Sequence, residues 1–375
     1  MTTAQEWSSR LDAAMVDGGI LTHYQPIVDL ARATVVGYEG LARFPAHPTT
    51  SPASWFTAAR AHGRLAALEA VSLRSALAGR ERLPPNTFLS VNVGPDVLDD
   101  PAVLDVLEGQ GSLAGVVVEL TEHARVDSYR DLRPQLERLR SAGGLIAIDD
   151  AGAGYAGLQH LIDIRPDMIK LDRNLVGSVD RDEARRALIE MVGTFASRVD
   201  AWVLAEGVET IEELETLTTL GVPLAQGYYL ARPGEPWPEL VAAATVQLRS
   251  LVSRQQQPTV RRLVERARTA FTLAHARTLY GPDHSEVVVI IDDHGRPVSV
   301  RDRDGLLRPI HDRLRVNVDT PVPQAAHRAL TRPEASRFTP LLCIDNAGRL
   351  LGVVRMERIL DHLASAAALQ PAAGD

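Results

Sequence analysis

The chain has 375 residues, of which 45% are hydrophobic and 23% are charged, and its formal net charge is −8. This length is typical of two domains, and the negative balance argues against a surface that binds long nucleic acid or an anionic membrane. Cys343 is the single cysteine, which excludes an intrachain disulfide and favours a reducing compartment, so we expect a cytoplasmic protein. We recognise no signal peptide in residues 1–18 and no apolar run long enough to span a membrane.

Short apolar runs divide the first 235 residues, and helix-like segments separate most of them. The predicted strands are His23–Leu30, Val35–Leu41, Phe88–Val93, Val116–Leu120, Leu145–Asp149, Met168–Leu171, Trp202–Ala205 and Leu224–Tyr229. Ala59–Leu77 and Arg181–Val199 have the clearest helical spacing. Strands that alternate with helices over this length predict an α/β fold, a (β/α)₈ TIM-like barrel. The loop Ala31–Thr34 is too short for a helical crossover, so the first two strands are expected to be antiparallel.

A cluster of three prolines and one glycine in residues 233–238 marks a boundary. We therefore assign residues 1–235 to the barrel, 236–280 to a helical linker and 281–375 to a smaller C-terminal α+β domain. Within the linker, Glu239–Arg254 and Val260–Leu279 are helix-like. The second segment is either a connecting helix that also contacts a second copy, or an ordinary helix packed on its own domain.

The C-terminal region contains an internal repeat, because residues 289–300 align with residues 342–353 at an offset of 53. Each copy has the pattern of a strand, an Asp/Asn–Gly turn and a second strand, which predicts a hairpin. The helix-like segment Val322–Leu330 lies between the copies. Two copies of a small α+β unit can bury their faces against each other. This pattern resembles a tandem cystathionine-β-synthase-type (CBS) module, a family that often binds adenine nucleotides and regulates attached enzymes.

Two adjacent carboxylates, Asp149 and Asp150, close the fifth predicted strand and precede a loop that contains Gly152 and Gly154. Neighbouring ionised carboxylates repel each other, and proteins keep such pairs mainly where a cation neutralises them. The same residues are equally compatible with a capped turn, in which Asp150 accepts backbone N–H groups at the start of a helix. This stretch alone leaves both interpretations open.

Polar side chains stand at or just after the ends of six of the predicted strands. They are Glu39, Asn92, Glu119, Glu122, Asp149, Asp150, Lys170, Asp172, Glu206 and Glu209, and Gln226 lies in the last strand. In a barrel all of these positions face the rim where the catalytic loops converge, and capping hardly explains so many of them. Oxygen ligands suit Mg²⁺ or Mn²⁺, whereas zinc would prefer histidine and cysteine.

Eight motifs follow one another along the first domain. They are Tyr24-Gln25-Pro26-Ile27, Glu39-Gly40-Leu41, Val91-Asn92-Val93, Glu119-Leu120-Thr121-Glu122, Asp149-Asp150-Ala151-Gly152-Ala153-Gly154-Tyr155, Ile169-Lys170-Leu171-Asp172, Glu206-Gly207-Val208-Glu209-Thr210 and Gln226-Gly227-Tyr228-Tyr229. Together they resemble the EAL family of cyclic di-GMP phosphodiesterases, over roughly residues 15 to 235. The resemblance implies a barrel with one antiparallel strand, a homodimer, and hydrolysis of cyclic di-GMP to linear pGpG with two divalent cations.

The resemblance also implies a role for individual residues. It makes Glu39, Asn92, Glu119 and Asp149 ligands of one Mg²⁺ or Mn²⁺ ion, with Asp149 bridging to a second ion that Asp150 binds. Two cations on such a cluster can lower the pKa of an attacking water and neutralise the phosphate.

The remaining candidate residues surround that metal pair. Lys170 is expected beside the attacking water and the phosphate, and Glu206 is expected to act as a base or a water-mediated ligand. The alternative for Lys170 is a structural ion pair with Asp172 or Glu206. The residues expected to line the substrate are Gln25, Leu41, Arg43 and Gln226, and those expected to stabilise the adjoining loops are Glu122, Asp172 and Glu209.

Three positions depart from the family pattern: Gly40 replaces an alanine, Ala151 replaces a phenylalanine, and Ala153 replaces a common threonine. The first change keeps the metal ligand, whereas the other two alter a loop that couples metal binding to dimer contacts in the family. We therefore consider three functions: an active phosphodiesterase gated by the C-terminal domain, a non-catalytic cyclic di-GMP receptor, and an interaction scaffold that has lost the ligand.

Overall fold

The computed structural model describes the chain except residues 1–3, 121–128, 150–160, 255–257, 280–286, 302–306, 311–314, 331, 333, 347 and 369–375. Backbone contacts group the chain into two units, Met1–Glu190 with Trp202–Ser250 and Met191–Ala201 with Leu251–Asp375. Each unit has its own cluster of buried apolar side chains. Among the described residues, no helix combines the length and the apolar character needed to cross a bilayer.

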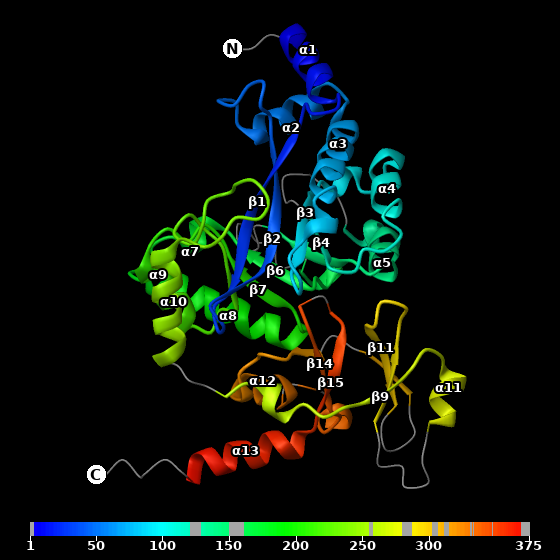
Figure 1. Ribbon diagram of the computed structural model, residues 1–375, viewed down its shortest axis with the longest axis vertical. Coiled ribbons are helices and arrows are strands. Elements are labelled where there is room, and N and C mark those ends of the chain that lie inside the picture. Colours follow the sequence, from blue (N-terminus) through cyan, green and yellow to red (C-terminus); the bar gives the residue numbers. More distant parts are fainter. Residues whose placement is uncertain are drawn as a thin grey trace. The chain divides into compact units, whose positions relative to one another are not determined.

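The first unit contains a closed barrel of eight strands, which neighbour one another in chain order. They are β1 (Leu21–Asp29), β2 (Thr34–Arg43), β3 (Phe88–Val93), β4 (Val116–Leu120), β5 (Leu145–Ile148), β6 (Met168–Leu171), β7 (Trp202–Ala205) and β8 (Leu224–Ala225). Strand β1 is antiparallel to both β2 and β8, and the other neighbours are parallel. Figure 1 labels β1 to β4, β6 and β7 of this barrel. The predicted eight-stranded barrel with an antiparallel first pair is therefore confirmed.

One layer of apolar side chains fills the interior of the barrel. Each strand contributes one member: Ile27, Val36, Phe88, Val117, Ala147, Met168, Leu204 and Leu224. All of them are at most 3% exposed, and burying each large aliphatic side chain contributes roughly 1.5–3 kcal/mol. Because this layer is apolar and packed, polar groups are accommodated more readily closer to the ends of the strands.

The helices described in residues 4–254 are α1 (Ala4–Ala14), α2 (Pro52–Ala61), α3 (Leu65–Leu77), α4 (Pro101–Glu108), α5 (Arg133–Ser141), α7 (Arg173–Val176), α8 (Glu183–Val199), α9 (Ile211–Thr219) and α10 (Ala242–Arg254). The helix predicted over Arg181–Val199 is confirmed as α8. The single helix predicted over Ala59–Leu77 is wrong, because the chain breaks between α2 and α3 at Gly63, whose φ is +64°. A glycine adopts this left-handed conformation without a steric penalty, so the apolar spacing continues while the helix does not.

The C-terminal unit repeats one strand–helix–strand–strand arrangement. The first copy comprises β9 (Arg268–Ala270), α11 (Leu273–Thr278), β10 (Val288–Ile291) and β11 (Pro297–Arg301), followed by β12 (Leu307–Pro309). The second comprises β13 (Arg315–Asn317), α12 (Val322–Leu330), β14 (Leu341–Ile344) and β15 (Leu350–Val354), followed by α13 (Met356–Ala368). In each copy the outer strand is parallel and the hairpin antiparallel, so the predicted repeat and its hairpins are confirmed.

The two hairpin turns have the same geometry. The N–H of Asp292 donates to the carbonyl of Arg296 at 2.8 Å, and the N–H of Asp345 donates to the carbonyl of Arg349 at 3.0 Å. The glycine of each turn has a φ in the left-handed region, +76° for Gly295 and +79° for Gly348. The Asp–Gly signature therefore marks a turn in which only glycine takes the left-handed position without strain.

The predicted helix Val260–Leu279 is wrong. This segment instead contains a 3₁₀ turn at Val260–Leu263, the strand β9 and the short helix α11. Val260 and Leu263 pack into the apolar cluster around α12 and α13, and Ala270 packs beside β10. The three- and four-residue apolar spacing was misleading because three short elements bury their apolar residues in separate clusters.

Candidate active site

Polar side chains form a second layer in the barrel, directly above the apolar layer. For seven strands a polar residue, on the strand or directly after it, lies two positions from the apolar one, toward the barrel mouth. These pairs are Ile27 and Gln25, Phe88 and Ser90, Val117 and Glu119, Ala147 and Asp149, Met168 and Lys170, Leu204 and Glu206, and Leu224 and Gln226. Side chains on one face of a strand recur every two residues, so each pair points into the barrel. For β1 the step runs backward along the chain, because β1 is antiparallel to β2 and β8.

Strand β2 reaches the same layer by a different step. The pairing of β1 with β2 shifts register between Ile27 and Val28, which leaves Val36 as an extra residue. Glu39 therefore lies three positions after Val36, and it stands directly opposite Gln25 across the strand pair. A β-bulge of this kind re-aims the side chains beyond it, and here it turns Glu39 inward.

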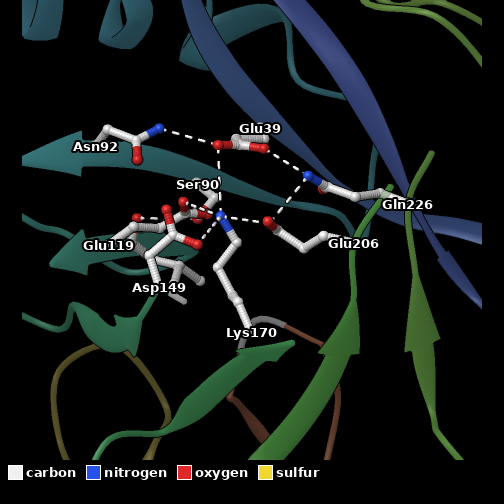
Figure 2. A network of polar contacts seen from close by, with 9 residues as sticks. Glu39, Ser90, Asn92, Glu119, Asp149, Lys170, Glu206 and Gln226 are labelled. Carbon is white, nitrogen blue, oxygen red and sulfur yellow. Dashed lines mark hydrogen bonds and ion pairs between the residues drawn. The ribbon is translucent and has the colours of Figure 1, made fainter. Parts of the chain in front are cut away.

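Lys170 lies at the centre of the cluster and is 1% exposed (Figure 2). Its ammonium nitrogen Nζ contacts Oε2 of Glu119, and it lies 2.6 Å from Oε1 of Glu206. It also lies 3.4 Å from Oδ1 of Asp149 and 3.5 Å from Oε1 of Glu39. Lys170 is the only lysine in the chain, and the other 39 basic residues counted with it are arginines. A compact ammonium group fits among four carboxylates, whereas a planar guanidinium needs more space.

Two amide side chains hold Glu39 from the other side. Nδ2 of Asn92 donates to Oε1 of Glu39 at 3.0 Å, and Nε2 of Gln226 donates to its Oε2 at 2.6 Å. The same Gln226 nitrogen also reaches Oε1 of Glu206 at 3.2 Å. These hydrogen bonds fix the orientation of Glu39, which is only 5% exposed.

Ser90 is a site residue that sequence reasoning missed. It is fully buried on β3, and its hydroxyl donates to Oε1 of Glu119, while Lys170 contacts the other oxygen of that carboxylate. The signal was available in the sequence, because Ser90 lies between Phe88 and Asn92 at the two-residue period of the strand.

The crowding of acids shifts several pKa values. Burial, together with the nearby Glu39, raises the pKa of Glu119 well above its usual range. Burial also raises the pKa of Glu206 to about 8, against the opposing effect of Lys170. Burial alone would lower the pKa of Lys170, but the facing carboxylates of Glu119 and Glu206 raise it well above the ordinary lysine value. The ammonium charge therefore belongs to the resting site.

The other predicted site residues are distributed around this cluster. Nε2 of Gln25 donates to the carbonyl of Ala231 at 3.1 Å, and Arg43 at the end of β2 donates to the carbonyl of Ala42 at 2.9 Å. Leu41 lies on β2 between Glu39 and Arg43 and is half-buried. Glu122 and Asp150 lie outside the described residues.

Two predicted loop residues lie outside the central network. Asp172 caps the N-terminus of α7 by accepting the N–H of Asn174 at 2.7 Å, and Glu209 pairs with Arg173 at 2.7 Å. Sequence reasoning did not single out Glu213, a buried member of the same loop system. Its carboxylate accepts the N–H of Glu209 at 2.9 Å and of Ser178 at 3.0 Å.

The donor set fits a hard divalent cation. Four carboxylates face a single ammonium group, and all of the candidate ligand atoms are oxygens. Within the part of the chain that the structure describes, no three acidic, histidine or cysteine side chains already surround one point as metal ligands. Lys170 lies between the carboxylates instead, so metal binding requires their rearrangement around the ion.

The fold and the site together define the class of protein. It is an eight-stranded barrel with an acidic candidate active site, in which buried carboxylates at the strand ends surround one lysine. Its fold and its site motifs agree with one family over most of the first unit. The chain belongs to the EAL domain family, whose domain matches residues 8–233.

Named relatives share this region. The chain is 32% identical over 235 residues to the probable cyclic di-GMP phosphodiesterase PdeG of Escherichia coli (strain K12), which covers 60% of this chain and 46% of PdeG. The chain thus spans less than half of that relative. Two solved structures of Klebsiella pneumoniae BlrP1 are similar to this chain, a calcium/cy-diGMP complex at pH 8.0 and a manganese/cy-diGMP complex at pH 6. Each shares 33% sequence identity with the chain and gives a TM-score of 0.52. The matches cover 58% of this chain and 56% of BlrP1 in the first, and 59% and 57% in the second.

Proposed function

We propose that this protein hydrolyses one phosphodiester bond of cyclic di-GMP and releases linear pGpG. The observation that supports this function best is the polar layer of the barrel, in which residues from seven strands surround Lys170 or Glu39 at the mouth. A receptor that only binds the dinucleotide has less need of so many buried carboxylates. The named phosphodiesterase relatives and the cyclic di-GMP complexes of BlrP1 support the same substrate.

We propose Glu39, Asn92, Glu119, Asp149 and Asp150 as the ligands of two Mg²⁺ or Mn²⁺ ions. When bound, such cations neutralise charge on the phosphate and make a water molecule more acidic. The excess of carboxylates over ammonium groups supports this assignment, since burying so many like charges is costly without cations. The calcium and manganese complexes of BlrP1 also support a divalent ion.

Two residues are proposed to act on the reacting groups. Lys170 contributes a fixed positive charge beside the phosphate, where negative charge develops during hydrolysis. Glu206 is 2.6 Å from Lys170 and accepts a hydrogen bond from Gln226, so it is held at the mouth to orient the attacking water and take its proton. Gln25, Leu41, Arg43 and Gln226 are proposed to contact the dinucleotide, and Glu122, Asp172 and Glu209 to stabilise the surrounding loops.

We propose that the C-terminal unit regulates this reaction. Its two strand–helix–strand–strand copies support the resemblance to a tandem CBS module, whose members often bind adenine nucleotides. A homodimer in the cytoplasm is part of the same proposal. Adding AMP or ATP to the turnover assay tests this regulation, and an unchanged rate of pGpG release across nucleotide concentrations contradicts it.

A turnover assay separates the candidate functions. The full chain is incubated with cyclic di-GMP and Mg²⁺, Mn²⁺ or Ca²⁺, and pGpG is measured by chromatography, with a chelator as the control. We expect turnover with Mg²⁺ or Mn²⁺, no turnover with chelator, and its loss in Glu39→Ala. Binding of cyclic di-GMP by calorimetry without any pGpG would indicate a receptor, and the absence of both would indicate a scaffold.

A further inference from the structure

The strand pairing that closes the barrel between β1 and β8 is short. Strand β8 has only two residues, and it pairs with β1 at Val28 and Asp29, whereas Gln25 lies beyond this pairing. Because β1 is antiparallel to its neighbours, its first residues are the ones that lie at the catalytic end. The part of β1 that carries Gln25 therefore extends beyond the strand that closes the barrel.

The segment that leaves the barrel covers this part of β1. The backbone of Gly234 pairs with that of Tyr24 through two hydrogen bonds. The N–H of Tyr24 donates to the carbonyl of Gly234 at 2.7 Å, and the N–H of Gly234 donates to the carbonyl of Tyr24 at 3.1 Å. Three residues later, the ring of Trp237 lies against two tyrosines, with its centre 4.4 Å from that of Tyr24 and 5.0 Å from that of Tyr38. We call the segment Gly234–Trp237 the closing strap.

The strap contacts the outer side of the residues that form the site. Tyr24 precedes Gln25 on β1, and Tyr38 precedes Glu39 on β2, so both rings project from the opposite face of the strand pair. Gln25 and Glu39 stand directly opposite each other on the inner face. Trp237 thus packs behind the two residues through which β1 and β2 contribute to the site.

The end of α3 holds Tyr24 from the other side. The Tyr24 hydroxyl donates to the carbonyl of Ala76 at 3.0 Å. A side chain at Gly79 would come within 2.3 Å of that hydroxyl and within 3.3 Å of Trp237. The absence of a side chain at Gly79 therefore allows Tyr24 and Trp237 to pack together.

We infer that Trp237 is a positioning residue, which holds the β1–β2 pair so that Gln25 and Glu39 keep their orientation at the mouth. Aromatic contacts of this kind stabilise packing beyond simple area burial, and here they act on a strand that lacks a full neighbour. The importance of Glu39 as a metal ligand rests on the proposed function, whereas the effect of Trp237 on the strand pair does not.

The test compares Trp237→Ala with Trp237→Phe and with Trp7→Ala. Trp7 is a suitable control because it is also half-buried and packs edge-on against another tryptophan, Trp55, with ring centres 5.4 Å apart. Hydrogen exchange of residues 21–43, measured by mass spectrometry without ligand, should be at least about 5-fold faster in Trp237→Ala. It should be unchanged in Trp7→Ala, and Trp237→Phe should restore most of the protection.

A second readout separates positioning from general stability. In Trp237→Ala the Mn²⁺ concentration that gives half-maximal turnover should rise about 10-fold, while Trp7→Ala keeps the wild-type value. If Trp237→Ala does not fold, Gly79→Ala crowds the Tyr24 hydroxyl and the Trp237 ring and serves the same comparison. Wild-type exchange of residues 21–43 in Trp237→Ala, or in Gly79→Ala where that variant replaces it, would overturn the inference. If the wild-type protein releases no pGpG, the proposed function fails, and the exchange experiment still decides the role of Trp237.

Discussion

The ammonium nitrogen of Lys170 lies 2.6 Å from Oε1 of Glu206, and the two residues stand on the neighbouring strands β6 and β7 or directly after them. Parallel pairing aligns Leu171 with Ala205, so Lys170 directly precedes and Glu206 directly follows the same aligned pair. The contact is part of a wider cluster, because Glu39, Glu119 and Asp149 also face the same nitrogen. One ammonium group is thus shared among four carboxylates from different strands.

Because Lys170 is the only lysine, protein labelled with ¹⁵N-lysine should give a single side-chain ammonium signal in an NMR spectrum. The facing carboxylates raise the pKa of Lys170 despite its burial, so we expect the signal to report a charged ammonium up to at least pH 10.5. Mg²⁺ should shift this signal as the carboxylates turn toward the ion. A signal that titrates below that pH, or one that ignores Mg²⁺, would contradict the geometry.

Removal of the Ser90 hydroxyl should weaken the site without unfolding the barrel. In Ser90→Ala, Glu119 loses the donor to its Oε1, and we expect about a 10-fold rise in the Mn²⁺ concentration for half-maximal turnover. Ser90→Thr retains a hydroxyl and should recover part of the affinity. Ser54→Ala, which removes an exposed hydroxyl on α2, is the matched control and should behave as wild type. Equal Mn²⁺ dependence in Ser90→Ala and Ser54→Ala would show that the contact has no role.

Glu69 on α3 should make the stability of the barrel depend on pH. Burial raises the pKa of this carboxyl to about 7, even though its Oε2 accepts the N–H of Gly94 at 2.7 Å. Since the pKa is higher in the folded state than its ordinary value of 4.5, the stabilisation is complete below pH 4.5 and is lost as the pH rises through 7. The full effect is at most about 3 kcal/mol.

The variant Glu69→Gln cannot ionise and still offers an oxygen to Gly94. We expect it to melt at a higher temperature than the wild type at pH 8, by a few degrees, and to match or fall below it at pH 4.5. Glu137→Gln, at an exposed position on α5 beside Arg140, should change neither melting temperature appreciably. An identical pH dependence of melting in wild type and Glu69→Gln would disprove the assignment.

Cys343 on β14 should report the opening of the C-terminal unit. It is fully buried, and burial raises the pKa of its thiol to about 12. Labelling by a maleimide at pH 8 should therefore be at least about 100-fold slower in the native protein than in denaturant. The chain has no other cysteine, so Cys343→Ser gives a true blank. If an adenine nucleotide binds this unit, it should slow the labelling further, and rapid labelling of the native protein would contradict the buried position.

The predicted site depended on two regularities that a single chain carries. Position at a predicted strand end identified most of the acidic residues of the site, and the order of the motifs along the chain indicated the family. The register of each strand brings Glu119, Asp149 and Glu206 to one layer, two residues beyond an apolar side chain. Glu39 breaks that regular step, because the bulge on β2 adds a residue that no local pattern announces.

Helix boundaries and the linker were harder to predict for a related reason. The apolar spacing continues through Gly63, although the helix ends there because this residue has a left-handed backbone conformation. The apolar residues of 260–279 belong to separate clusters rather than to one helix face. Periodicity reports which residues become buried, whereas it does not report against which neighbour they are buried.

The sequence by itself determined the alternation of strands and helices, the internal repeat and the acidic residues at the strand ends, because these follow from local periodicity and residue chemistry. The tertiary structure alone decided that Lys170 stands among four carboxylates, that Ser90 orients Glu119, and that Trp237 lies behind Gln25 and Glu39. Those relationships join residues from about 20 to more than 200 positions apart, and they exist only once closure of the barrel brings those strands together.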